Sequence, residues 1–289
     1  MKLSIVTPSY NQGQFISETI SSVLSQEVID FEYVIVDGGS ADNTIEVLKS
    51  FGDQIKWVSE RDEGQADAVN KGIKATTGEI IGWINSDDIY YPGAFKEVLG
   101  VFKANPEIDV VYGRADHVDL VGQPFEEYPS EKWNYDRLIE HCFICQPALF
   151  FRRKVVEQCG PLEQKLNFCM DYEYWIRLAK NGINFRYIEK KLAGSRLYNE
   201  NKTLGSRVAV HEEINDMLLS KLGSVPDRWL FNYSHILAAE KVDRTTCPRR
   251  FILLAGLYSI ISSLRWNRHV SKRMINTMFG WYFGHSRHK

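Results

Sequence analysis

The first ninety residues alternate between short apolar segments and segments of helical periodicity, and this alternation restricts the possible folds most. The apolar segments cover residues 3–6, 32–36, 55–59 and 79–84. Each has the length and composition of a buried strand. Between them, apolar residues recur every three or four positions, as on one face of a helix. This β-α-β-α-β-α-β order predicts a parallel sheet with helices on both faces.

Each predicted strand runs into a polar loop. These loops contain Thr7-Pro8, Asp37, Asp62 and the adjacent pair Asp87-Asp88. The carboxyl ends of parallel strands meet at one edge of the sheet, where open α/β sheets bind their ligands. We therefore expect acids that are far apart in the sequence to form one site. A turn or helix cap is the alternative for any single aspartate, and for Asp42 it is the better interpretation.

The pair Asp87-Asp88 is the most specific of these strand ends. It follows the strand predicted over residues 79–84 almost directly. Mg²⁺ and Mn²⁺ prefer oxygen ligands and commonly share them with substrate phosphates. The pair thus predicts a Mn²⁺ or Mg²⁺ site that holds a nucleoside diphosphate. The alternative is a polar turn before Pro92, with Asp88 capping the next helix.

Composition narrows the class of protein. Of 289 residues, 44% are hydrophobic and 25% are charged, and the net charge is -2. This allows one large core or one core plus a small appendage, and it does not suggest a nucleic-acid-binding protein. No apolar run reaches the ~20 residues that span a bilayer, and no signal peptide is expected because Met1-Lys2 leads straight into a strand. The five cysteines, an odd number, predict reduced thiols in a cytoplasmic protein.

The rest of the chain predicts further elements and a second, helical part. We expect a helix over 92–104, strands over 110–112 and 185–188, an apolar segment over 146–151, and a helix over 171–179 that ends at Asn181-Gly182. The polar and aromatic segment 113–140 is expected to cross the surface. From Arg207 the pattern is helical to the end. The expected organisation is a domain over 1–206, with the nucleotide side in 1–112 and the acceptor side in 113–206, and a helical extension over 207–289.

The helical extension is one-sided in charge. No acidic residue follows Asp243, whereas the basic residues there are Arg244, Arg249, Arg250, Arg265, Arg268, Lys272, Arg273, Arg287 and Lys289. They flank an apolar run over 251–261. Such helices could lie peripherally in an anionic membrane interface. They could equally pack on the first domain or on a partner subunit, for example in a homo-oligomer.

Five motifs in order resemble the family 2 glycosyltransferases of the GT-A fold. They are Ser4-Ile5-Val6-Thr7-Pro8-Ser9-Tyr10-Asn11, Val36-Asp37-Gly38-Gly39-Ser40-Ala41-Asp42-Asn43-Thr44, Asn70-Lys71-Gly72-Ile73, Thr77-Gly78-Glu79 and Asn85-Ser86-Asp87-Asp88. The resemblance extends to about Thr203. It implies an inverting transfer of a sugar from a nucleotide diphosphate sugar to a hydroxyl of a glycan or lipid-linked acceptor. A UDP-sugar is the first candidate donor. The resemblance also implies a role in polysaccharide, glycolipid or cell-surface glycan synthesis.

The resemblance also assigns residues to roles. Asp37 is expected to contact the nucleotide base, Asp87 the ribose and Asp88 the metal, and Asp171 is expected to be the catalytic base. Further donor-site candidates are Thr7, Pro8, Tyr10, Arg61, Asp62, Asp67 and Arg196, of which Arg196 is a phosphate partner by charge. Gln146 and Trp175 are expected on the acceptor side, although core packing is the better interpretation for the Trp175 ring. A helix cap is the alternative for Asp171, and a surface ion pair is the alternative for Arg61 with Asp62.

Three positions depart from the family pattern. Val69 stands where an Arg is frequent, Met170 replaces the first acid of a Glu-Asp pair, and Tyr198 replaces a common His. These departures keep open a second function, that of a catalytically impaired nucleotide-sugar-binding subunit. A sugar-phosphate nucleotidyltransferase is disfavoured because the loop over 7–13 is not a glycine-rich phosphate loop with a basic residue. A dinucleotide-dependent oxidoreductase is disfavoured because no G-x-G-x-x-G follows a strand.

Overall fold

The computed structural model describes residues 1–28, 30–198 and 205–284. Thr203, Arg287 and Lys289, which the sequence interpretation used, lie outside these residues. The chain divides into two compact units. We call Met1–Tyr135 with Cys142–Asn199 the N-terminal unit, and Asp136–His141 with Glu200–Lys289 the C-terminal unit. Within the described residues, no helix combines the length and the apolar character needed to cross a membrane.

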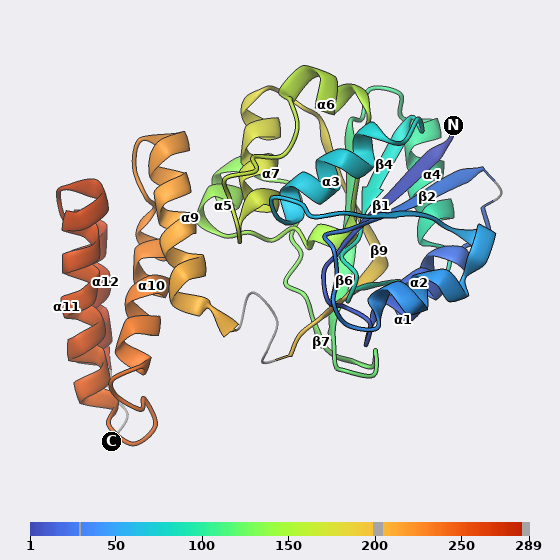
Figure 1. The fold of residues 1–289 in the computed structure, drawn as a ribbon. Coiled ribbons are helices and arrows are strands. Elements are labelled where there is room, and N and C mark those ends of the chain that lie inside the picture. Colours follow the sequence, from blue (N-terminus) through green and yellow to red (C-terminus); the bar gives the residue numbers. More distant parts are fainter. Residues whose placement is uncertain (29, 199–204, 285–289) are drawn as a thin grey trace. The chain divides into compact units, whose positions relative to one another are not determined.

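A nine-stranded sheet organises the N-terminal unit (Figure 1). Its order is β3-β2-β1-β4-β8-β6-β9-β5, and β7 pairs with β6 outside this path. The strands are β1 (Leu3–Ser9), β2 (Phe31–Asp37), β3 (Lys56–Ser59), β4 (Ile80–Trp83), β5 (Ile89–Tyr90), β6 (Val110–Val118), β7 (Pro124–Glu127), β8 (Leu149–Arg152) and β9 (Phe185–Arg196). The pairs β3-β2, β2-β1 and β1-β4 are parallel, as the alternating pattern predicts. The other half is mixed, because β8 pairs antiparallel with both β4 and β6.

Helices cover both faces of this sheet (Figure 1). They are α1 (Ile16–Leu24), α2 (Thr44–Ser50), α3 (Gln65–Lys74), α4 (Ala94–Ala104), α6 (Lys154–Cys159) and α7 (Met170–Lys180), with short 3-10 turns η1 (Gly52–Gln54) and η2 (Gln146–Ala148). On β2, Ile35 joins the large core formed with α1 and α4, whereas Val34 and Val36 pack with Ala68 of α3. This alternation is the period-two pattern of a strand buried on both faces.

The close approach of α3 to the sheet depends on a glycine. A Cβ at Gly72 would lie 2.3 Å from Val6 Cγ1 on β1. Any larger residue at position 72 would therefore push α3 off the strand whose carboxyl end carries Thr7 and Pro8.

Three strands are longer than the apolar pattern predicts. The strand predicted over 3–6 continues to Ser9, so Thr7 and Pro8 lie in β1 and the prediction of a loop there is wrong. The predicted strand over 110–112 continues to Val118, and the one over 185–188 continues to Arg196. The prediction of a surface path from residue 113 is therefore wrong for the first six residues. The pattern fails because this part of β6 carries a buried acid, Asp116, whose carboxylate accepts hydrogen bonds from Lys191 Nζ at 2.6 Å and Tyr91 Oη at 3.0 Å.

Glu32 ties together the amino ends of β1, β2 and β4. Its carboxylate accepts hydrogen bonds from Lys2 Nζ (2.9 Å), Ser4 Oγ (2.7 Å) and the backbone N–H groups of Thr77 (2.5 Å) and Gly78 (2.8 Å). Burial alone would raise the pKa of Glu32, but these bonds outweigh it and lower the pKa to about 2. The ionised carboxylate therefore stabilises the fold.

We expect Glu32→Gln to lower the free energy of unfolding at pH 7 by about 1–3 kcal/mol, because the amide cannot accept all four bonds. The folded pKa is about 2 and the ordinary value is 4.5, so the contribution is complete above pH 4.5 and is lost as the pH falls toward 2. The gap in melting temperature between wild type and variant should thus narrow from pH 6 to pH 3. Glu27→Gln, at an exposed position before β2, is the matched control. A gap that is independent of pH would contradict the assignment.

The C-terminal unit is helical, in line with the pattern beyond Arg207. Its helices are α9 (Arg207–Leu222), α10 (Asp227–Ala239), α11 (Pro248–Asn267) and α12 (Lys272–Gly284), and residues 136–140 of α5 (Tyr135–Glu140) belong to it. Trp229 Nε1 donates to Ile139 O at 3.1 Å and Arg273 Nη1 to Glu140 Oε1 at 2.9 Å, which holds α5 against this unit. The predicted domain boundary at residue 206 stays a prediction.

Candidate active site

The carboxyl ends of β1, β2 and β3 lie in register at one edge of the sheet. Ser9 faces Asp37, and Asp37 faces Ser59. The Asp37 carboxylate is fully buried, and its Oδ2 accepts from Gly39 N (3.1 Å), Ser40 N (2.9 Å) and Ser59 Oγ (2.7 Å). The buried Asp37 carboxylate therefore fixes the backbone of the loop that begins at Gly38. We expect a nucleotide base to contact this loop and not the carboxylate itself.

Asp62 is the more accessible acid at the same edge. A Cβ at Gly38 would lie 2.7 Å from Asp62 Oδ2, so the glycine permits the loop after β2 to meet the loop after β3. The Asp62 side chain is half-buried, Arg61 is exposed, and 62% of Tyr10 is exposed. Tyr10, Arg61 and Asp62 thus offer the aromatic, cationic and anionic groups with which a nucleoside could be held.

The remaining donor-site candidates on β1 and α3 point into the protein. Thr7 and Pro8 are buried, and Thr7 Oγ1 lies 3.1 Å from Tyr33 Oη. Asp67 accepts from Glu63 N at 3.1 Å and from Gln164 Nε2 at 2.9 Å, and it pairs with Lys71 at 3.1 Å. In this structure these residues position the loops around the edge.

The two adjacent aspartates differ in surroundings. Asp88 is 3% exposed, with Oδ1 accepting from Arg196 N at 2.8 Å and Oδ2 from Asn85 Nδ2 at 3.2 Å. Asp87 keeps part of its surface exposed, and its Oδ2 accepts from Tyr198 Oη at 3.1 Å. Asp87 is therefore the more exposed residue of the two.

The pKa values of the two aspartates also differ. Burial raises the pKa of Asp87 and raises that of Asp88 further, and the negative charge of Asp87 adds to the shift at Asp88. Asp87 consequently ionises before Asp88. Bonds from Tyr198 and the charge of Arg196 favour the ionised form of Asp87.

Arg196 fixes the loop that carries both acids. Its side chain is fully buried, and it donates from Nε to Asp87 O (2.7 Å), from Nη1 to Asp119 O (2.6 Å) and from Nη2 to Glu18 Oε2 (2.6 Å). The guanidinium also lies over the Phe15 ring. A phosphate contact, which the charge alone predicted, would require these bonds to be exchanged.

A layer of amide side chains supports the acids. The sequence assigned a role only to Gln146, on the acceptor side, and none to Gln65 or Asn85. Asn85 Oδ1 accepts from Gln65 Nε2 at 2.7 Å and from Trp83 Nε1 at 3.0 Å. Gln146 Nε2 donates to Trp83 O at 2.6 Å, while its buried Oε1 has no partner among the described residues. The only signal for Asn85 was its position beside the acid pair.

Trp175 is a core residue here. It is 1% exposed and packs at 5.8 Å, centroid to centroid, from Tyr174. The Trp175 ring therefore packs in the core, as the sequence analysis favoured. Stacking on an acceptor sugar would require the ring to become accessible.

Asp171 lies in the first turn of α7, and its carboxylate is half-buried. Cys169 is the cap residue, so Asp171 sits inside the helix, where the positive end of the dipole favours its charge. Its Oδ1 accepts from Tyr172 N at 2.8 Å. Burial raises the pKa of Cys145, and the negative charges of Asp88 and Asp171 raise it further. The charges of both acids therefore act on one buried thiol.

The acids present suit a cation that is shared with a ligand. In the described part of the chain, no three His, Cys, Asp or Glu side chains come together in a way that could hold an ion. Of the adjacent pair, Asp87 keeps part of its surface exposed, and a cation there would take its other ligands from phosphate and water. The residues therefore fit a Mn²⁺ or Mg²⁺ that arrives with a nucleoside diphosphate.

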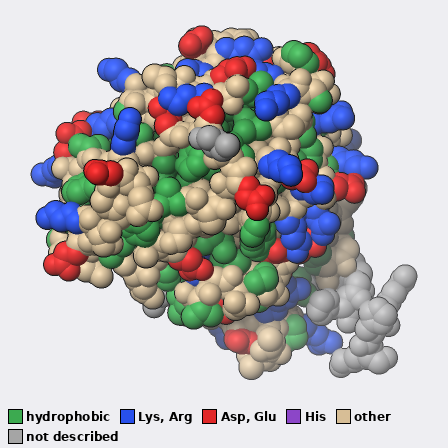
Figure 2. Space-filling view, turned by 90° about the vertical axis from the view of Figure 1, so that its right-hand side faces the viewer, with side chains coloured by type: hydrophobic (Ala, Val, Ile, Leu, Met, Phe, Trp, Pro, Cys, Tyr) green, Lys and Arg blue, Asp and Glu red, His purple; other side chains and the backbone are tan. Residues whose placement is uncertain are grey.

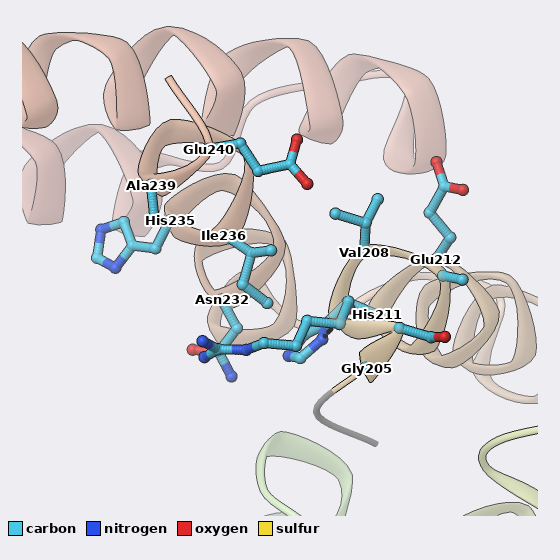
Figure 3. A pocket seen from close by; sticks show the side chains of 12 residues that line it. Gly205, Val208, His211, Glu212, Asn232, His235, Ile236, Ala239 and Glu240 are labelled. Atoms are coloured by element: carbon cyan, nitrogen blue, oxygen red, sulfur yellow. Dashed lines mark hydrogen bonds between the residues drawn. The ribbon is translucent and has the colours of Figure 1, made fainter. Parts of the chain in front are cut away.

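A cavity of about 910 Å³ lies within the C-terminal unit, between α9 and α10 (Figure 3). Its lining includes Arg207, Glu212 and Glu240, and burial lowers the pKa of His211 and His235. These groups give a mixed lining without adjacent carboxylates. Volume alone therefore does not identify the active site.

On the face seen in Figure 2, acidic and basic side chains are interspersed and form no large patch of one charge. This agrees with the small net charge of -2. Nothing on that face suggests a nucleic-acid footprint.

Comparison with known proteins identifies relatives of this arrangement. The sequence model described as "Glycosyl transferase family 2" matches residues 4–160. An uncharacterised glycosyltransferase of Rickettsia conorii is 28% identical over 233 residues, which cover 75% of this chain and 37% of the relative. A PGL/p-HBAD biosynthesis glycosyltransferase of Mycobacterium bovis is 27% identical, with 75% and 84% covered. The chain thus spans little more than a third of the length of the Rickettsia relative.

Solved structures share the fold. TarS of S. aureus, in complex with UDP-GlcNAc, superposes with a TM-score of 0.63 at 16% identity over 91% of this chain and 81% of that one. The mannosyltransferase PcManGT of Pyrobaculum calidifontis, in complex with GDP-Man and Mn²⁺, gives 0.61 at 15% identity over 96% and 78%. These similarities confirm the predicted GT-A fold class.

Proposed function

The chain belongs to glycosyl transferase family 2, and we propose that it moves a sugar from a nucleotide diphosphate sugar to an acceptor hydroxyl with inversion. One observation carries the proposal. Asp62 and the partly exposed Asp87 lie at one sheet edge with the Asp37 loop, and the charges of Asp88 and Asp171 both raise the pKa of one thiol, Cys145. A UDP-sugar is our first candidate donor, since TarS is known with UDP-GlcNAc. A GDP-sugar is the second, from PcManGT.

The donor would lie across this edge. We assign the nucleoside to Tyr10, Arg61 and Asp62 over the Asp37 loop, and the diphosphate to the side of Asp87. Mn²⁺ is the proposed cation, because PcManGT and a mycobacterial glucosyl-3-phosphoglycerate synthase are known with it. We move the metal role from Asp88 to Asp87, because Asp88 is buried and bonded to Arg196 N and Asn85. When bound, the cation would supply positive charge against the leaving diphosphate.

Asp171 is the proposed base for the acceptor. Its carboxylate would take the proton of the attacking hydroxyl as that oxygen bonds to the anomeric carbon. The bond from this carbon to the diphosphate breaks at the same time, through an oxocarbenium-like state. Attack from the face opposite the leaving group inverts the anomeric configuration.

The acceptor side and the biological role are proposals of a coarser kind. We assign residues 1–206 to catalysis and residues 207–289 to an accessory extension. Gln146, whose Oε1 has no partner among the described residues, is assigned to the acceptor side. The printed name of the M. bovis relative supports a glycolipid or other cell-surface glycan as product. A lipid-linked acceptor suits that role.

One observation favours a second function. Tyr198 Oη donates to Asp87 Oδ2 at 3.1 Å, and its ring packs 5.1 Å from the Phe15 ring, centroid to centroid. If Tyr198 keeps this position when a donor binds, it would occupy ligand space at Asp87. The protein would then be a nucleotide-sugar-binding subunit that does not catalyse transfer.

A donor screen without acceptor tests both functions. The protein would be incubated with UDP-, GDP- and dTDP-sugars and Mn²⁺, and released sugar would be followed by NMR before its anomers equilibrate. With water as slow acceptor, we expect one donor to release its nucleoside diphosphate and a sugar of inverted configuration. A sugar of retained configuration would contradict the single-base mechanism. Binding with no release, even with a glycan-lipid extract as acceptor, would favour the second function.

A further inference from the structure

The exposed face of α11 is more apolar than its buried face. Five large aliphatic side chains are exposed, namely Leu253 (59%), Leu257 (53%), Ile260 (38%), Ile261 (51%) and Leu264 (51%). Their spacing places them on one side of the helix. The buried side instead carries Ala255, Ser259, Ser262 and Ser263, between Phe251 and Trp266. A surface helix of a soluble protein shows the reverse pattern.

Specific contacts fix this rotation of α11. Trp266 Nε1 donates to Asp216 Oδ1 at 2.7 Å, and Arg265 Nη1 donates to Glu212 Oε1 at 2.7 Å. The inward serines are also satisfied, since Ser259 Oγ donates to Ala255 O at 2.7 Å and Ser263 Oγ to His269 O at 2.6 Å. The aliphatic stripe is therefore built into the fold of the C-terminal unit.

A groove of about 390 Å³ lies beside the stripe. Leu253, Leu254, Leu257, Tyr258 and Val242 form its apolar walls, and Lys241 and Arg250 are its two cations. On α12, Ile275 (39%) and Phe279 (58%) are exposed one turn apart. A groove with apolar walls and cations suits an amphiphile with an anionic head.

The charges around the stripe select its partner. Exposed Arg244, Arg249 and Arg250 lie at one end of α11, and exposed Arg268 and Lys272 lie at the other. No acidic residue follows Asp243. Pairing this face with a second copy would bring the cations that flank both stripes toward one another, which is unfavourable. Anionic lipid headgroups complement them.

We propose that the aliphatic stripe of α11, with its groove and flanking cations, binds the surface of an anionic lipid bilayer. The leucines and isoleucines enter the boundary between headgroups and acyl chains, and the arginines meet lipid phosphates. This binding is independent of the proposed transfer reaction and of any nucleotide. It assigns a function to the excess of basic residues after Asp243.

Vesicle flotation tests the stripe. The full chain should float with vesicles of 70% phosphatidylcholine and 30% phosphatidylglycerol, and at least tenfold less with pure phosphatidylcholine. Leu257→Asp with Ile261→Asp should reduce flotation at least tenfold with little change in melting temperature, because both side chains are exposed. Val121→Asp, at a 71% exposed position of the N-terminal unit, is the control and should float like wild type. Equal flotation of the double variant and wild type would overturn the proposal.

A charge variant and the state of association complete the test. Arg249→Gln with Arg250→Gln should weaken flotation several-fold and reduce its salt dependence, whereas Lys96→Gln with Lys103→Gln on α4 should not. Sedimentation without vesicles measures whether the chain self-associates, and so tests whether a second copy covers the stripe. If the chain self-associates, the Leu257→Asp, Ile261→Asp variant dissociates and wild type does not float, then the stripe is a subunit interface and the proposal fails. Donor consumption in solution by this variant should match wild type, so a failed flotation test is distinct from a failed transferase assignment.

Discussion

Asp171→Asn is expected to reduce turnover by about 10²–10⁴-fold, the range that a positioned general base contributes. Donor affinity should be unchanged, because Asp171 lies on α7 and not among the strand-end loops proposed for the nucleotide. The fold should also be kept, since asparagine retains the oxygen that accepts from Tyr172 N. Release of the nucleoside diphosphate and calorimetric donor binding measure the two effects separately.

Glu163→Gln is the matched control for this variant. Glu163 is an exposed acid in the loop that leads to α7, and its loss should leave turnover at the wild-type level. Unchanged turnover in Asp171→Asn would remove Asp171 from its role. A parallel loss of donor affinity would place Asp171 in donor binding instead.

Asp87→Asn and Asp88→Asn are expected to fail in different ways. Asp87→Asn should weaken Mn²⁺-dependent nucleoside diphosphate binding roughly 100-fold or more, since a cation stabilises phosphate charge by several kcal/mol and about 1.4 kcal/mol is tenfold. Its melting temperature should hardly change. Asp88→Asn should instead lose about 1–3 kcal/mol of stability, because a buried donor then faces an amide nitrogen.

The comparison of the two variants decides which acid serves the metal. Titration calorimetry with Mn²⁺ and with EDTA, alongside thermal melts, measures both effects. If Asp88→Asn abolishes Mn²⁺-dependent binding and Asp87→Asn does not, Asp88 holds the metal, as the family resemblance implies, and the proposed role of Asp87 is wrong.

The first four strands and their common edge were predictable because apolar periodicity and the rule for parallel strands are local and strong. The choice between Asp87 and Asp88 was not, because it depends on Arg196, more than a hundred residues away, whose backbone N–H binds Asp88. The length of β6 was hidden by Asp116, a buried acid that Lys191 neutralises. The orientation of α11 was hidden for a related reason, since its more apolar side faces outward.

The most direct test of the central claim is a calorimetric titration of the wild-type chain with UDP, GDP and dTDP, each with Mn²⁺ and with EDTA. We predict that one of them, UDP first, binds in the presence of Mn²⁺, that EDTA abolishes the binding, and that Asp87→Asn does the same. Failure of all three nucleotides to bind, or binding of equal strength in EDTA, would contradict a cation-assisted diphosphate site at this sheet edge.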